Sequence, residues 1–126
     1  MSKLLIKKWL IAVLALGLST SAIANEEVRK LNDNPNYWAF PGGDYNNWRY
    51  TELNQINTAN ASKIVTAWTF STGRLQGHEG GPLVLPGSAT GLAGDTLYIH
   101  SSFPNDVFAI SLDTLEIVWY FEPQQD

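Results

Sequence analysis

Apolar and polar residues alternate along the second half of the chain, with breaks at intervals of about ten residues. From residue 63 to residue 71, every second side chain falls on one face of an extended segment: Ile64, Thr66, Trp68 and Phe70. This alternation predicts a strand. Four further short apolar runs follow at residues 82–85, 96–100, 107–111 and 117–121. Turn-forming residues fill the breaks, so the pattern predicts an all-β meander.

The segment from residue 82 to residue 121 has the size of one blade of a β-propeller. It spans about 40 residues and contains four predicted strands, as a propeller blade does. The strand predicted at residues 63–71 precedes these four strands and is additional to them. The pattern therefore predicts about one blade plus one extra strand, with a surface loop at residues 86–94.

Residues 25–62 lack this alternation and are expected to form an N-terminal arm. Asn25 is a residue type that caps helices, and two glutamates follow it where the helix dipole favours acids. Pro35 ends this helix early. The arm then crowds five aromatic residues into one loop: Trp38, Phe40, Tyr45, Trp48 and Tyr50. We expect these side chains to pack the arm onto the rest of the protein, and a ligand-stacking platform is the alternative.

The first 24 residues have the composition of a secretory signal peptide. Three lysines within the first eight residues precede an apolar run at residues 9–18, and an Ala-Ile-Ala cleavage sequence ends at Ala24. The apolar run is shorter than the roughly 20 residues that span a bilayer. We therefore expect export with cleavage before Asn25, and an uncleaved anchor is the alternative.

Without this leader the chain is strongly acidic. Three of the eight basic residues lie in the leader and all twelve acidic residues follow it, so residues 25–126 carry five basic and twelve acidic side chains, a formal charge of −7. This charge argues against a nucleic acid partner. It favours a basic protein partner, although it also serves solubility alone. The chain has no cysteine, which excludes disulfides and cysteine metal sites in this segment.

The loop between the strands predicted at 63–71 and 82–85 carries the clearest candidate chemistry. It places His78 and Glu79 among three glycines. Glycine has no Cβ, so the backbone around this polar pair can approach a flat, bulky group closely. The sequence therefore predicts a binding site at this loop, and a tight turn with a solvated Glu is the alternative.

Two longer stretches of sequence carry a family resemblance. They are AWTFSTGRLQGHEGGPLV at residues 67–84 and LYIHSSFPNDVFAISL at residues 97–112. Together they resemble the beginning of the large subunit of PQQ-dependent methanol and alcohol dehydrogenases, the quinoprotein alcohol dehydrogenase family. The resemblance covers residues 25–126 and implies the start of an eight-bladed β-propeller from residue 63 on. Because one blade alone leaves open sheet edges, we expect this chain to be the N-terminal piece of a longer one.

The same resemblance implies an activity and its cofactors. Such enzymes oxidise a primary alcohol to an aldehyde in the periplasm, here with methanol as the expected substrate, and pass the electrons to a cytochrome c. They bind pyrroloquinoline quinone (PQQ) beside a calcium or lanthanide ion. The metal ligands and the catalytic base are expected beyond residue 126. The choice of metal stays open, as does a small subunit or a homodimer.

One site residue of this chain follows from the resemblance. Glu79 matches the glutamate with which the family contacts its cofactor. PQQ carries carboxylates of its own, and two carboxylates in contact cannot both be charged without a cation or a shared proton. We therefore expect Glu79 to be protonated beside the cofactor, or bridged to it by an Arg or a water. Its role is to position the cofactor, and it is not the catalytic base.

The neighbouring polar residues have simpler interpretations. His78 is expected to be packed or solvated, and orienting Glu79 is its alternative role. Arg74 is expected to be solvated, and offsetting the cofactor's charge is its alternative role. His100 is expected to point into a seam between blades. His78, Glu79 and His100 do not supply enough ligands at a suitable spacing for a zinc site.

The last predicted hairpin, at residues 109–119, resembles a docking motif that quinoprotein propellers repeat from blade to blade. In that motif Trp119 would pack between neighbouring blades, and an ordinary strand aromatic is the alternative. Leu115 stands where the motif usually has Gly, which predicts a turn of different geometry.

Two other classes of function stay open at this level. One is a non-catalytic propeller scaffold that repeats the same Trp motif, and such a scaffold has no need for the GHEGG stretch. The other is a secreted binding module that folds alone, which would leave two sheet edges exposed.

Overall fold

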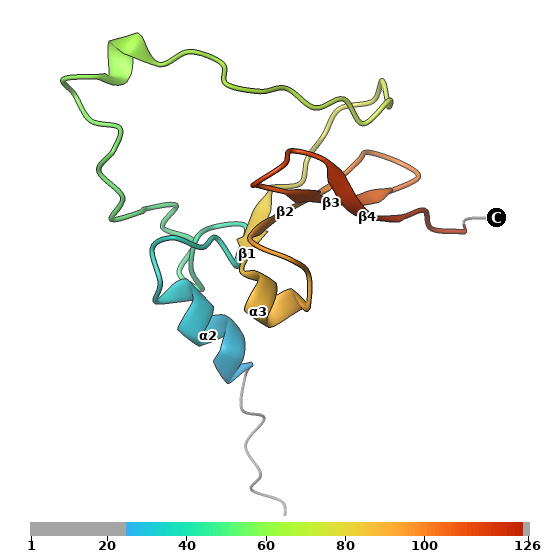
Figure 1. Cartoon of the computed structure of the whole chain (residues 1–126), viewed down its shortest axis with the longest axis horizontal. Helices are drawn as coiled ribbons and strands as arrows, with labels where there is room; N and C mark the ends of the chain where they lie inside the picture. The colour runs from blue at the N-terminus through green and yellow to red at the C-terminus, as the bar shows by residue number, and fades with distance from the viewer. Residues whose placement is uncertain (1–24, 125–126) are drawn as a thin grey trace, which may run out of the picture.

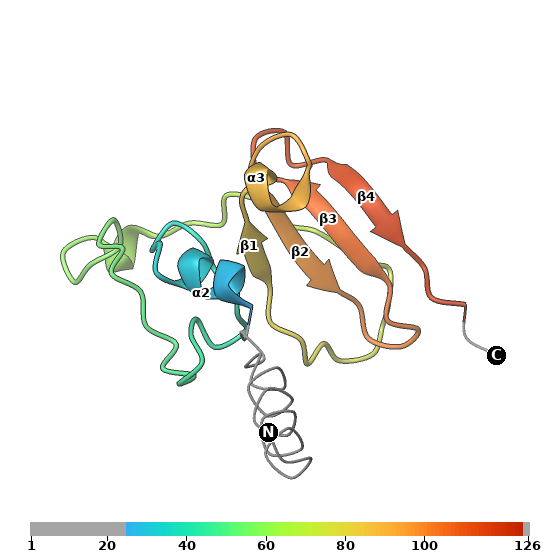
Figure 2. The ribbon, with the colours of Figure 1, turned by 90° about the horizontal axis from the view of Figure 1, so that it is seen from below.

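The strands of this protein form one antiparallel sheet. The computed structural model describes residues 25–124, so the signal peptide predicted at residues 1–24 lies outside the described residues. Four strands lie side by side in chain order (Figures 1 and 2): β1 (Leu83–Leu85), β2 (Thr96–His100), β3 (Val107–Ser111) and β4 (Ile117–Phe121). The predicted all-β meander is confirmed. β1 begins one residue later than predicted, after Pro82, which has no backbone N–H to donate to a ladder.

β2 and β3 form the centre of the sheet and hold its buried residues. They pair over their whole length, with Thr96 opposite Ser111 at one end. Both of these small polar side chains are buried, and so are three apolar ones: Phe108, Ala109 and Ile110. All five residues of β4 are exposed, because β4 is the last strand of the sheet.

β4 departs from a regular ladder at one residue. Trp119 lies opposite Ala109 and Ile117 lies opposite Ile110, so Val118 has no partner residue on β3. Such a bulge increases the local twist of the strand. Trp119 is 46% exposed and stacks on Phe121 of the same strand, with ring centroids 6.1 Å apart. Docking of Trp119 against another blade stays a prediction.

The turn between β3 and β4 has a backbone conformation that favours glycine. Leu115 has φ of +60°, in the left-handed region, which costs a residue with a Cβ about 1–2 kcal/mol. Ser111 holds the turn, because its Oγ accepts the backbone N–H groups of Asp113 and Thr114 at 3.2 and 3.3 Å. A turn geometry different from that of the family motif stays a prediction. The residue takes a left-handed conformation and bears the strain.

The N-terminal arm is attached to the sheet at β1. The predicted short helix is present as α2 (Glu26–Asn32), although Asn25 makes no side-chain capping hydrogen bond. Trp38 and Val84 exchange two backbone hydrogen bonds of 3.0 and 2.9 Å. The arm therefore lies on the β1 side of the sheet (Figure 2) and occupies backbone groups that an edge strand would otherwise expose.

The aromatic loop of the arm is only partly packed. Trp38 and Phe40 are half-buried, as predicted. The packing prediction is wrong for the other three members, which are 54%, 73% and 71% exposed: Tyr45, Trp48 and Tyr50. The arm then continues through a short 3-10 helix, η1 (Ala61–Lys63).

The predicted strand at residues 63–71 is not formed. A strand requires a neighbour that pairs with its backbone groups, and within residues 25–124 this segment has no such neighbour. Its aromatic face is present nonetheless. Trp68 and Phe70 stack with ring centroids 5.8 Å apart, and Phe70 packs edge-on against Phe108 of β3 at 5.1 Å.

The predicted loop at residues 86–94 contains one helical turn. This turn is α3 (Gly87–Thr90), and it closes when the backbone N–H of Gly91 donates to the carbonyl of Gly87 at 2.8 Å. Gly91 has φ of +75°, the usual way for glycine to end a helix. None of the helices within residues 25–124 has the length and apolar character needed to cross a membrane.

Replacing Leu115 by Gly is expected to relieve the backbone strain at this turn. Glycine adopts a left-handed backbone without steric cost, and its greater freedom in the unfolded chain offsets only part of the gain. The Leu115 side chain is 42% exposed, so its partly buried surface is lost in L115G and in L115A alike, and L115A is the reference. We expect the free energy of unfolding of L115G to exceed that of L115A by about 0.5–1 kcal/mol, measured by urea titration. A lower stability of L115G than of L115A would contradict the strain at this turn.

Candidate functional site

The loop that carries Glu79 crosses the end of the sheet where β2 ends and β3 begins. We call residues 73–81 the glycine loop and residues 101–106 the β2–β3 turn. In Figure 2 the yellow-green trace of the glycine loop passes the end of β2 before the chain enters β1. Three side-chain contacts join the glycine loop to the β2–β3 turn and to the last residue of β2, and together they fix the loop to the sheet.

The first contact is an ion pair between Arg74 and Asp106. The Nε and Nη2 groups of Arg74 both donate to Oδ2 of Asp106, at 2.9 and 2.6 Å. The Asp106 side chain is 2% exposed, whereas that of Arg74 is 34% exposed. The hydrogen bond to Asp106 raises the pKa of Arg74 above its ordinary value, although burial acts in the opposite direction. Solvation of Arg74 was the expectation, and the structure contradicts it.

Asp106 is built into the β2–β3 turn by its own backbone. Its N–H donates to Oγ of Ser101 at 3.0 Å, and its carbonyl accepts the N–H of Ser101 at 2.8 Å. Ser101 is itself fully buried. The carboxylate therefore cannot reach solvent without opening the turn. The ion pair forms only if the glycine loop brings Arg74 to the turn.

The second and third contacts lie closer to Glu79. Oγ of Ser102 donates to the carbonyl of Gln76 at 3.3 Å. The Nδ1 atom of His78 lies 3.2 Å from the carbonyl of His100, and its Nε2 atom lies 3.1 Å from Oγ1 of Thr72. A carbonyl only accepts, so Nδ1 carries the proton, and in the neutral ring Nε2 accepts from the Thr72 hydroxyl. Both ring nitrogens are thus used by groups other than Glu79, and the orienting role for His78 is not formed.

Glycine at position 80 is required by a close approach. A Cβ built on Gly80 would overlap the imidazole of His100, with Nε2 as its nearest atom. The His100 ring thus lies against the glycine loop, while its Nδ1 atom is 2.9 Å from the carbonyl of Ser101. Within residues 25–124 the His100 ring faces this loop, and its expected place in a seam between blades stays a prediction.

Glu79 lies between two anchored neighbours and is itself free. His78 on one side is hydrogen-bonded at both ring nitrogens, and Gly80 on the other side packs against the His100 ring. Glu79 is exposed, and its carboxyl group makes no hydrogen bond or ion pair with any residue between 25 and 124. The loop therefore presents one unpaired carboxyl group from a fixed backbone.

A hollow of about 440 Å³ opens beside the glycine loop. It combines aromatic, apolar and polar walls, which is typical of ligand sites. The residues that line it are Phe70, Ser71, Thr72, Arg74, His78, Gly80, Pro82, Ile99 and His100. All nine belong to the two stretches singled out from the sequence, at residues 67–84 and 97–112, but the hollow itself depends on the contact between loop and turn.

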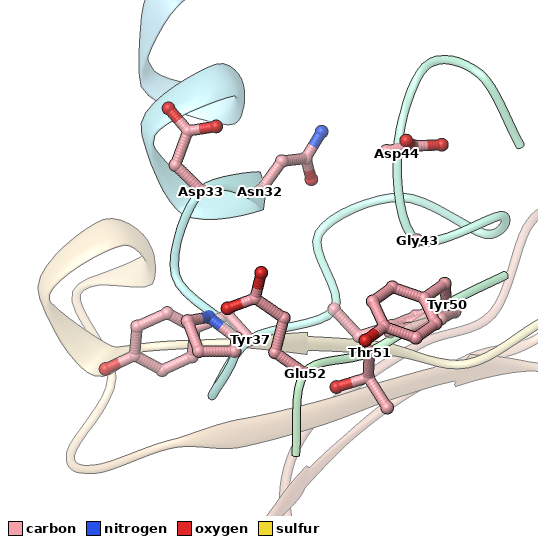
Figure 3. Close-up of a pocket in the computed structure, with 10 residues that line it drawn as sticks. Asn32, Asp33, Tyr37, Gly43, Asp44, Tyr50, Thr51 and Glu52 are labelled. Carbon is pink, nitrogen blue, oxygen red and sulfur yellow. The ribbon is translucent and has the colours of Figure 1, made fainter. Parts of the chain in front are cut away.

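A second hollow, of about 300 Å³, lies in the N-terminal arm (Figure 3). Side chains from the end of α2, the aromatic loop and residues 50–52 face one another around it. Its walls include three acidic residues, Asp33, Asp44 and Glu52. Sequence reasoning missed this hollow, because only the fold of the arm brings these positions together. Across residues 25–124, no three His, Asp or Glu side chains gather closely enough to hold a metal ion.

Replacing Gly80 by Ala is expected to displace the His100 ring, since the added methyl group needs the same space. The ring would lose its hydrogen bond to the Ser101 carbonyl, which is worth about 1 kcal/mol. We expect G80A to lower the free energy of unfolding by about this amount, measured by urea titration. In the H100A background the obstructing ring is absent, so adding G80A should cost nothing further. Equal losses in both backgrounds would show that the contact does not exist.

Three comparisons relate this chain to known proteins. Residues 38–126 match the family described as PQQ, glucose/ethanol/alcohol dehydrogenase, beta-propeller domain. A lanthanide-dependent methanol dehydrogenase from Methylacidiphilum fumariolicum is 45% identical over 113 residues, which are 88% of this chain and 17% of the relative. Subunit 1 of the cytochrome c methanol dehydrogenase of Methylobacterium organophilum is 42% identical over 120 residues, which are 92% of this chain and 18% of that subunit.

The fold agrees with these sequence matches. A solved europium-containing methanol dehydrogenase superposes with a TM-score of 0.70 at 45% identity, covering 81% of this chain and 17% of that one. The chain thus spans less than a fifth of the length of the relatives that it matches. The family match covers the glycine loop and the whole sheet. This chain belongs to the PQQ-dependent glucose/ethanol/alcohol dehydrogenase family and carries part of its β-propeller domain.

Proposed function

We propose that the protein carrying this chain oxidises a primary alcohol, with methanol as the expected substrate, to the aldehyde in the periplasm, and that a cytochrome c accepts the electrons. The observation that carries the proposal is the match of the glycine loop and its sheet to methanol dehydrogenases at 42–45% identity. The printed names of these relatives include dependence on a lanthanide and linkage to cytochrome c. The acidic charge of residues 25–126 is consistent with a basic electron acceptor.

The residues of the glycine loop fit contact with PQQ. Glu79 presents a carboxyl group that no described residue engages, and an added Cβ at Gly77 would meet no atom within 4 Å. When bound, PQQ supplies the acceptor for the hydride of the alcohol, and the metal ion beside it supplies a Lewis acid. The metal ligands and the base are proposed to lie beyond residue 126.

The charge of the cofactor restricts how Glu79 makes this contact. A carboxylate next to another carboxylate requires a cation, a proton or a bridging water. Arg74 is the nearest cation in the loop sequence, but Asp106 engages its Nε and Nη2 groups. We therefore propose that Glu79 shares a proton or a water with a cofactor carboxylate, and that its role is to position the cofactor.

The same findings weigh against the two alternatives. A non-catalytic scaffold has no use for a glycine loop with an unpaired carboxyl group, and the family match is to dehydrogenases. A self-sufficient binding module would expose apolar strands, and the exposed residues of β4 are all apolar or aromatic.

The activity is tested on the protein that carries this chain, purified from its source cells. We expect methanol-dependent reduction of a dye or of cytochrome c that requires PQQ and either calcium or a lanthanide. Removal of the metal with a chelator should abolish turnover, and adding it back should restore it. A preparation that binds PQQ but oxidises no primary alcohol would contradict the proposed reaction, and one that binds no PQQ would contradict the proposed cofactor.

The role of Glu79 is tested by comparing E79Q with E79A. Gln has nearly the same shape and keeps a hydrogen-bond donor, so E79Q should retain PQQ within about threefold, whereas E79A should lose about tenfold, close to 1.4 kcal/mol. Equilibrium titration with PQQ measures both effects. Equal affinity of E79A and the wild type would show that Glu79 does not contact the cofactor.

A further inference from the structure

The glycine loop depends on residues distant in the sequence for its position. Arg74 contacts a residue 32 positions away, Gln76 one 26 positions away and His78 one 22 positions away. All three partners lie in the β2–β3 turn or at the end of β2. Local hydrogen bonds, such as that between Thr72 and His78, shape the loop, and these three long-range contacts tie it to the sheet.

The contact of Arg74 differs in kind from the other two. It joins two full charges, it uses two donors of the guanidinium, and its acceptor is almost completely buried. A buried carboxylate that loses its counter-charge is strongly destabilised, whereas a lost surface hydrogen bond costs little. The Asp106 carboxylate has one further oxygen, Oδ1, which is buried and accepts no hydrogen bond from any described residue. Tyr120 of β4 also interacts with Asp106, and Arg74 supplies the full positive charge that compensates this carboxylate.

The anchored residues lie directly before Glu79. The chain passes from Arg74 through Gln76 to His78, and each of these three makes one contact to the sheet. Gly80 then packs against the His100 ring. If the first contact is released, the loop can rotate about the remaining weak ones, and the free carboxyl group of Glu79 moves with it.

We propose that Arg74 is a positioning residue for the cofactor: its ion pair with buried Asp106 holds the glycine loop against the β2–β3 turn and thereby sets the place of the Glu79 carboxyl group. The identity of the ligand, PQQ, rests on the proposed function. The anchoring of the loop by Arg74 does not depend on that function. In this proposal Arg74 acts through Asp106, because its Nε and Nη2 groups donate to that carboxylate.

The experiment uses the protein that carries this chain, with the variants R74M, D106N and R74M/D106N. K63M is the matched control, because Lys63 is an exposed cation on η1 and its removal changes the net charge by the same amount. Two quantities are measured: the equilibrium affinity for PQQ, and the hydrogen exchange of the peptide covering residues 73–81 in the absence of PQQ. Exchange of residues 107–121, which cover β3 and β4 and leave out the β2–β3 turn, reports whether the sheet stays folded.

For R74M and D106N we expect faster exchange in the glycine loop, unchanged exchange in the sheet, and PQQ affinity lowered about tenfold. The double variant should be no worse than either single one, because both remove the same contact. K63M should behave as the wild type. R74K keeps the charge but lacks the two-donor fork, so it should fall between the wild type and R74M.

Three outcomes would overturn the inference. R74M could leave loop exchange unchanged, which would show that the pair does not anchor the loop. D106N could bind PQQ more tightly while R74M binds it less tightly, which would make Arg74 a direct ligand of the cofactor. The losses of R74M and D106N could add in the double variant, which would show two independent roles.

If the wild type binds no PQQ at all, the proposed function fails, and the exchange data still decide whether Arg74 anchors the loop. Should R74M unfold, R74K carries the same comparison.

Discussion

The buried carboxylate of Asp106 is the constraint on which the geometry of the candidate site depends. Its side chain is 2% exposed, and two backbone hydrogen bonds with Ser101 keep it inside the β2–β3 turn. Leaving a charge there without a partner costs far more than a surface hydrogen bond can repay. Arg74 supplies that partner from the glycine loop, so the loop must return to the turn. The contacts of Gln76 and His78 follow from this approach.

The central strands give the loop a firm support. β2 and β3 carry the buried residues of the sheet, and the ring of Phe108 on β3 contacts the ring of Phe70, with centroids 5.1 Å apart. The segment before the glycine loop is therefore held by an aromatic contact, and the segment after it enters β1. With both ends and the middle fixed, a loop can hold a functional side chain in one place, which is the usual arrangement of binding residues on a rigid scaffold.

The distribution of charge in the loop separates two tasks. Arg74 neutralises a buried carboxylate of the protein. Glu79 keeps its carboxyl group free of protein partners among the described residues, and its neighbours His78 and Gly80 are engaged elsewhere. Rigid backbone and free side chain together are what a positioning contact requires. The family membership of the chain and the contacts of its own side chains thus agree on this role for the glycine loop.

Local sequence determined the strands of this protein, and tertiary contacts decided the site. β2, β3 and β4 lie where alternation and turn residues predicted them, because the period of two and the breaks are properties of neighbouring residues. The family resemblance of the glycine loop could likewise be recognised from one continuous stretch of sequence. The extended segment at 63–71 lacks a ladder because strands need partners, and Leu115 takes a left-handed backbone because Ser111 holds its turn. Arg74 and Asp106 are 32 residues apart in the sequence, so no local pattern predicts that they pair. The pair forms because Asp106 is buried in the folded chain.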